Sequence, residues 1–152
     1  MNSYEEKLLR ADEAVAAHEA DKAVTLYRDA IEAAPQRADA YYNIAVLYSQ
    51  QHQFEPAVNF FEKAAELNPT DETIYNNLGV LYYSHTEYHK AEQNFIKALR
   101  LNADYQEALY GLANTYSKQN RIFKAITLLE KILSLESIID RERIKTALDK
   151  IC

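Results

Sequence analysis

Two histidines, His85 and His89, are four residues apart. On a continuous helix this spacing would place both imidazoles on one face, where they could bind zinc. The residues between them are polar and predict a turn that joins two helices. Such a turn would separate the imidazoles, so we expect ordinary turn histidines and no metal site.

Acid–base or nucleophilic chemistry is the next possibility. Carboxylate pairs such as Glu5 with Glu6 occur, but the pattern predicts no cleft around them. A catalytic Ser, His and Asp set is not supported by the layout, although sequence order does not show which side chains meet in space. The two glycines, Gly79 and Gly111, fall inside predicted helices and form no phosphate-binding loop. We expect a protein that is not an enzyme, with no catalytic residues and no cofactor.

Composition narrows the partners and the compartment. The one cysteine, Cys152, excludes an internal disulfide, and the N-terminal residues show neither a basic leader nor an apolar stretch. No apolar run approaches the roughly 18 residues of a membrane span. The formal charge of −6 comes with mixed signs and no basic stripe for nucleic acid. We therefore expect a soluble, cytoplasmic protein that binds neither membrane nor nucleic acid.

The apolar residues repeat every 34 positions, which divides the chain into blocks 4–37, 38–71, 72–105 and 106–139. Several columns of this alignment hold small residues: Ala11, Ala45, Gly79 and Ala113; Ala23, Ala57, Ala91 and Ala125; Ala30, Ala64 and Ala98, with Ile132 in the fourth block. Small residues at fixed positions let helix backbones approach closely, and large apolar columns fill the spaces beside them. The period predicts stacked units that complete one another's core.

Each block predicts two amphipathic helices. Apolar residues fall at helical spacing, as at Tyr41, Ile44 and Tyr48, and polar stretches at 51–53, 85–87 and 119–121 mark the turns. Turns this short force antiparallel neighbours. Residues of about 140–151 form one more amphipathic segment, which predicts a helix that caps the last unit. We expect a single solenoid domain over residues 1–152.

These blocks resemble the tetratricopeptide repeat (TPR) family, with the second block, Ala38 to Pro69, closest to the family pattern. The first block departs at Lys7 and Arg10, which are polar in apolar columns, and the fourth has Ser137 in place of the closing proline. The resemblance implies an all-α fold, a right-handed superhelix of antiparallel helix pairs with four TPR units and a C-terminal capping helix.

The resemblance also implies that the first helix of each unit lines a concave groove. The implied peptide-binding positions are Asp39, Tyr42, Asn43, Val46, Thr73, Asn76, Asn77, Val80, Tyr83, Glu107, Tyr110 and Asn114. Asparagines in the column of Asn43 and Asn77 bond a peptide backbone in the family, because an amide offers a donor and an acceptor. Ordinary surface asparagines are the equal alternative. Tyrosines and valines would supply apolar contact area.

The expected partner follows from the charges at these positions. One TPR class grips the C-terminal tails of chaperones with lysines and an arginine, and the matching positions here lack those cations, so we expect no chaperone tail. Asp12, Asp39 and Glu107 would repel an acidic ligand. The sequence predicts a protein or peptide ligand that is neutral or basic, with apolar or aromatic anchors.

The expected function is therefore a non-enzymatic protein-protein interaction module. Two alternatives remain open at this point. The chain is the TPR segment of a larger protein such as a glycosyltransferase, or it is a scaffold that self-assembles.

Overall fold

The computed structural model describes residues 3–135 and 141–151, with the side chains of 141–144 and 151 left out. In these residues all regular structure is α-helical. The helices are α1 Ser3–Ala16, α2 Ala20–Ala33, α3 Ala38–Gln50, α4 Phe54–Leu67, α5 Glu72–Ser84, α6 Tyr88–Leu101, α7 Gln106–Lys118, α8 Ile122–Ser134 and α9 Arg141–Ile151. The predicted all-α class is confirmed, and the predicted capping segment is helix α9. No helix of the described part is long and apolar enough to cross a membrane.

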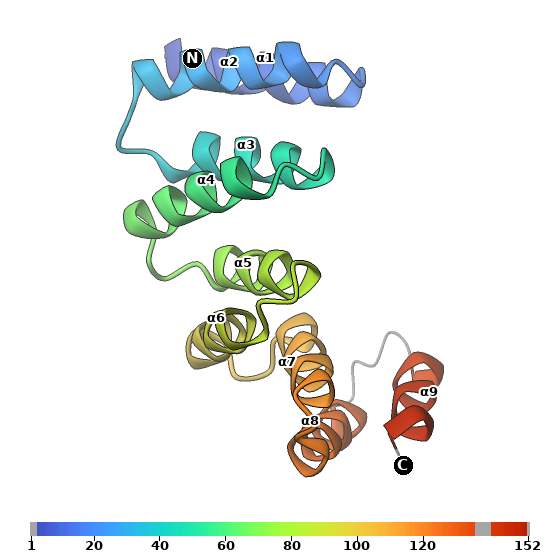
Figure 1. Cartoon of the computed structure of the whole chain (residues 1–152). Coiled ribbons are helices and arrows are strands. Elements are labelled where there is room, and N and C mark those ends of the chain that lie inside the picture. Colours follow the sequence, from blue (N-terminus) through green and yellow to red (C-terminus); the bar gives the residue numbers. More distant parts are fainter. Residues whose placement is uncertain (1–2, 136–140, 152) are drawn as a thin grey trace. The chain divides into compact units, whose positions relative to one another are not determined.

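The chain forms two compact units, one that ends at Thr70 and one that begins at Asp71. The first contains the helix pairs α1/α2 and α3/α4, and the second contains α5/α6, α7/α8 and α9 (Figure 1). The three predicted turns at 51–53, 85–87 and 119–121 lie between α3 and α4, α5 and α6, and α7 and α8. The predicted helix pairs are thus confirmed within each unit.

One residue in the turn within each of the four helix pairs has a left-handed backbone. The four are His18, His52, Thr86 and Asn120, with φ of 61°, 59°, 61° and 59°. The amide of the following residue bonds back into the helix, as from Glu87 N to Tyr82 O at 3.0 Å, and so satisfies a carbonyl at the helix end. Every turn within a helix pair therefore uses the same conformation, although none has a glycine there.

The small columns lie in the core, as predicted. Ala11, Ala45 and Ala113 have no exposed surface, and the same holds for Ala23, Ala57, Ala91 and Ala125. Large side chains pack beside them, such as Phe61 at 2% and Phe95 at 1% exposure. Burial on this scale supplies most of the stability of the helix pairs.

The α6 side chain Phe95 fills the space between α5 and α7. A Cβ built on Gly79 would lie 2.7 Å from the Phe95 ring, and one built on Gly111 would lie 2.4 Å from it. Real Cβ atoms essentially never come so close, so an alanine at either position would force the Phe95 ring to shift. This contact fixes the separation of α5 and α7.

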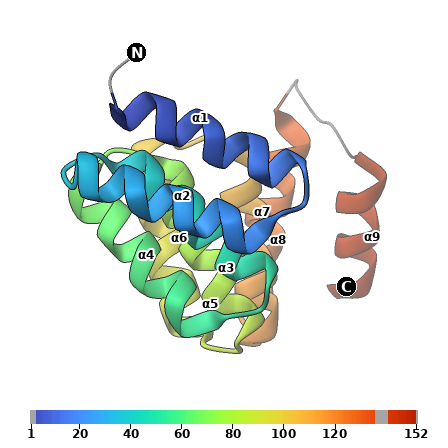
Figure 2. The same cartoon turned by 90° about the horizontal axis from the view of Figure 1, so that it is seen from above.

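Helix α9 covers the end of the second unit. Its residues Ala147 and Leu148 pack against a buried cluster of Leu109, Ala113, Leu129 and Ile132 from α7 and α8. In both views α9 stands beside α7 and α8 (Figures 1 and 2). The capping role predicted for this helix is confirmed for these two side chains. The other apolar residues of the predicted segment, Ile144 and Ile151, lie outside the described side chains.

The left-handed turns predict a stabilising substitution. Thr86→Gly removes a β-branched side chain from a conformation that costs about 1–2 kcal/mol for an L-residue, against about 0.5–1 kcal/mol for the greater freedom of glycine in the unfolded chain. We expect the free energy of unfolding in urea to rise by about 0.5–1 kcal/mol. Asn120→Gly is the control and should gain less, because asparagine tolerates this region. A Thr86→Gly protein no more stable than the wild type would contradict the prediction.

The glycine contacts predict the opposite effect. Gly111→Ala should lower the free energy of unfolding by about 1–2 kcal/mol, because overpacking at about 1–3 kcal/mol exceeds the gain of about 1 kcal/mol in helix propensity. Adding Phe95→Leu to this variant should cost less than Phe95→Leu costs alone in the wild type, since the smaller side chain relieves the clash. Urea unfolding of the four proteins measures this coupling. A Gly111→Ala protein more stable than the wild type would show that propensity dominates.

Candidate functional site

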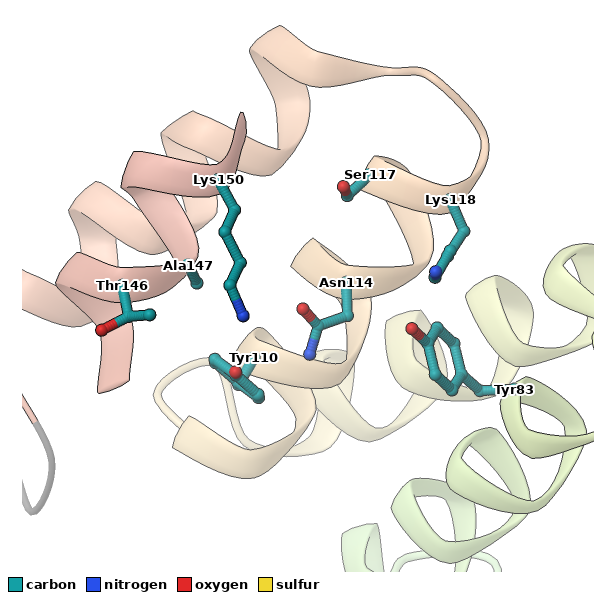
Figure 3. Close-up of a pocket in the computed structure, with 8 residues that line it drawn as sticks. All are labelled: Tyr83, Tyr110, Asn114, Ser117, Lys118, Thr146, Ala147 and Lys150. Atoms are coloured by element: carbon teal, nitrogen blue, oxygen red, sulfur yellow. The ribbon is translucent and has the colours of Figure 1, made fainter. Parts of the chain in front are cut away.

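A pocket of about 570 Å³ lies in the second unit where α5, α7 and α9 meet (Figure 3). Its walls are Tyr83 from α5, Tyr110, Asn114, Ser117 and Lys118 from α7, and Thr146, Ala147 and Lys150 from α9. Three of the predicted peptide-binding residues, Tyr83, Tyr110 and Asn114, thus line one cavity. We call it the α5–α7–α9 pocket.

The core contacts position these walls. Gly79 and Gly111 hold α5 and α7 against Phe95, and Tyr83 lies one helical turn after Gly79. Tyr110 packs on the buried α7/α8 cluster, and the same cluster anchors α9 through Ala147. The lining residues of α7 follow a spacing of four, three and one, so they share one face of that helix.

Tyr83 brings an aromatic ring and a hydroxyl to the pocket. It is partly buried, and its ring centroid lies 5.6 Å from that of Tyr88. Burial, with the nearby Tyr88 and Tyr110, raises the pKa of the Tyr83 phenol above its usual value. The phenol therefore keeps its proton at neutral pH and can donate a hydrogen bond.

The other predicted positions on α5 differ from one another. Val80 is 51% exposed and offers apolar surface, and Asn77 is partly buried. Thr73 is held by the N-cap of the helix, since its amide donates to the Asp71 carboxylate at 2.9 Å and its hydroxyl donates to the same oxygen. Asn76 is only 7% exposed, and its Oδ1 has no hydrogen-bond partner among the residues that the structure describes. The sequence placed Asn76 on an open face, whereas the structure buries it.

In the first unit the predicted positions on α3 take part in structural contacts. Tyr42 meets the Phe61 ring edge-on, with centroids 5.7 Å apart, and Val46 is partly buried. The Asn43 side chain bonds the Tyr27 hydroxyl, which itself donates to Asp12. Burial and the Asp12 carboxylate raise the pKa of Tyr27, so the Tyr27 hydroxyl stays protonated between Asp12 and Asn43.

Two of the three acids expected to set the charge of the groove are already bonded. Asp39 Oδ2 accepts from the Tyr4 hydroxyl at 3.2 Å and from Arg37 at 3.1 Å. Burial and Asp39 raise the pKa of Tyr4 to about 12. Asp12 accepts from Tyr27, while Glu107 is exposed on α7. The expected repulsion of acidic ligands is therefore weaker at Asp12 and Asp39 than their formal charge suggests.

Sequence reasoning missed Ser117, Lys118, Thr146 and Lys150 as lining residues. The positions of Ser117 and Lys118, one turn after Asn114, carried a usable signal because they continue its helix face. Thr146 and Lys150 carried none. Lys150 belongs to the polar face of the amphipathic capping segment, and only the docking of α9 brings it and Thr146 next to α7.

A second, smaller hollow of about 300 Å³ lies on α7 and α8 and is lined by Tyr116, Phe123, Lys124, Thr127 and Leu128. Phe123 is 89% exposed. The same column in the other three blocks holds Asp21, Glu55 and His89, so an aromatic residue is an exception there. This surface is the main competitor of the α5–α7–α9 pocket.

The two histidines considered for metal binding do not share a helix. His85 directly follows α5, and His89 lies in α6, on the other side of the predicted turn. In the described part of the chain, no group of three or more His, Cys, Asp or Glu side chains could hold a metal ion.

Comparison with known proteins identifies the fold. Solved structures similar to this chain include MamA, with 22% identity over 93% of this chain and 81% of that chain and a TM-score of 0.85. PilF of Pseudomonas aeruginosa has 19% identity over 97% of this chain and 67% of its own, with a TM-score of 0.83. YrrB, described as a TPR protein with an unusual peptide-binding site, has 18% identity over 92% and 71%, with a TM-score of 0.77. At these identities the similarity shows the fold alone.

No curated protein matches the sequence significantly. Family models for the tetratricopeptide repeat match residues 38–71, 60–93 and 82–137. The matches run through three of the four predicted blocks and coincide with helices α3 to α8. The chain belongs to the tetratricopeptide repeat family.

Proposed function

We propose that this TPR chain is a non-enzymatic interaction module that binds a peptide or helix of a partner protein on the face formed by α5 and α7. The observation that carries the proposal is the convergence of Tyr83, Tyr110 and Asn114 on one pocket. Aromatic side chains beside a hollow surface are typical of the residues that dominate protein binding energy.

The pocket residues suit a peptide in two ways. Tyr83 and Tyr110 supply flat apolar surface with a hydroxyl at the tip, and the exposed Val80 extends this surface along α5. The Asn114 amide can both donate to and accept from a peptide unit, whatever the side chain of that unit. Affinity would thus come from an apolar or aromatic anchor, and register from the amide.

Charge at the start of α7 favours a neutral or basic residue of the partner. Glu107 is exposed there, and a basic side chain nearby would gain a modest ion pair. In the first unit, α3 carries Tyr42 and Val46 at the positions that correspond to Tyr110 and Asn114 of α7. A chain with one cysteine suits a reducing compartment, so we place this function in the cytoplasm.

The asparagines of the two units should differ in their effect on stability. Asn43→Ala removes the hydrogen bond to Tyr27 and should lower the free energy of unfolding by about 1 kcal/mol. Asn114 makes no side-chain hydrogen bond with a described residue, so Asn114→Ala should stay within about 0.5 kcal/mol of the wild type. Urea unfolding of both variants tests this. Equal losses would mean that Asn114 is also structural.

The binding face is tested with peptides selected from a phage-displayed library on the wild-type chain. Fluorescence anisotropy with the selected peptides should show a loss of roughly 30-fold in Tyr110→Ala and of about fivefold in Asn114→Ala. Tyr110→Phe keeps the packing against the α7/α8 cluster and should lose only a few-fold. Circular dichroism checks that each variant is folded.

Phe123→Ala is the matched control, because it removes an exposed aromatic from the competing surface on α8. It should leave the affinity unchanged. Loss of binding in Phe123→Ala with none in Tyr110→Ala would move the interaction to α8 and refute the proposal. If the library yields no binder and the molecular mass by light scattering rises with protein concentration, self-assembly replaces peptide binding as the proposed function.

A further inference from the structure

We propose that the α5–α7–α9 pocket binds a carboxylate group of the partner peptide between Lys118 of α7 and Lys150 of α9. This inference rests on the proposed function and adds a charge requirement to it. Figure 3 shows the two lysines on opposite sides of Asn114, with Lys150 near Tyr110 and Lys118 near Tyr83.

The sign of the charge in the pocket is opposite to that of the whole chain. The formal net charge of the protein is −6, yet the lining residues include two lysines and no carboxylate. Neither ammonium forms an ion pair with a residue that the structure describes, whereas exposed lysines elsewhere do, as Lys90 with Glu87 at 2.6 Å. Two like charges facing one cavity favour an anion between them.

Neutral donors complete the surroundings of such an anion. Asn114 and Ser117 of α7 lie between Lys150 and Lys118 in Figure 3, and the Tyr83 phenol stays protonated at neutral pH. A carboxylate accepts up to four hydrogen bonds and so could use several of these donors at once. Hydrogen bonds from charged donors are stronger than those between neutral groups.

Other ligands fit less well. A basic side chain would meet two ammonium groups, and a purely apolar one would take both out of water without compensation. The cavity, at about 570 Å³, lies within the range of pockets that hold a ligand of drug-like size, which is enough for an acidic side chain and its neighbour. An acidic residue next to an aromatic anchor would use the lysines and the tyrosines together.

The position of the pocket also gives the peptide a direction. Glu107 lies in the first turn of α7 and Lys118 in its last turn. A segment that carries a basic residue near Glu107 and an acidic one near Lys118 would pair with both ends, and the reversed segment would meet like charges. The sequence had led us to expect a neutral or basic partner throughout.

The test uses three synthetic peptides with one backbone. The first is acetyl-Ala-Tyr-Glu-Glu-Leu-amide, the second has Gln in place of both Glu residues, and the third is the Gln peptide with a free C-terminal carboxylate. Each is titrated into the isotope-labelled full chain, and binding is followed by the NMR shifts of the Asn114 and Lys118 amides. The Glu peptide should bind at least fivefold more tightly than the amidated Gln peptide.

Lysine variants locate the effect. Lys118→Gln and Lys150→Gln should each weaken the Glu peptide by about three- to fivefold and leave the Gln peptide unchanged. Lys124→Gln removes the same charge from α8 and should change neither. Raising the salt from 50 to 500 mM should weaken the Glu peptide only, because exposed charges are screened.

Three results would overturn the inference: equal binding of the Glu and amidated Gln peptides, no binding of the Glu peptide, or losses in Lys118→Gln and Lys150→Gln no larger than in Lys124→Gln. The proposed function fails separately, when peptides from the library do not depend on Tyr110 and Asn114. The third peptide separates the sources. If it binds like the Glu peptide, the pocket also accepts a chain terminus.

Discussion

The packing of Phe95 between two glycines is the contact on which the second unit depends. Because a Cβ at Gly79 or Gly111 would overlap the ring, the benzyl group reaches both α5 and α7 and sets how close they lie. Tyr83 follows one of these glycines by a helical turn, and Tyr110 and Asn114 flank the other. The side chains that line the pocket are therefore held by a rigid, buried contact, although they themselves are partly exposed.

The turns within the four helix pairs share one backbone conformation. A residue with φ near 60° closes α1, α3, α5 and α7, and its neighbour bonds a carbonyl of the last turn. The cost is small for asparagine and larger for the β-branched threonine at Thr86.

The candidate site combines packing from the repeats with charge from the cap. The repeats supply tyrosines and an asparagine on α5 and α7, while α9 adds Lys150 and Thr146 to the same cavity. In the first unit Asp39 is bonded to Tyr4 and Arg37, and Asp12 is bonded to Tyr27. Their formal charges therefore overstate the negative potential at this surface. Asn43 and Asn114 were both expected from the sequence to contact a ligand, but their surroundings differ. Asn43 is bonded to Tyr27, whereas Asn114 lines the pocket.

The sequence alone determined the helix pairs, the turns between them, the buried small residues and the capping helix. A period of 34 residues is a local signal, because apolar spacing within a helix and polar residues at a turn leave their mark on neighbouring positions. The resemblance to the TPR family implied that Tyr83, Tyr110 and Asn114 line one groove. Only the tertiary structure decided that Asn76 is buried, that Asp39 and Asp12 are bonded, and that Lys150 lies against α7. These outcomes depend on contacts between side chains far apart in the chain, such as Tyr4 with Asp39, and a repeat pattern carries no information about such pairs.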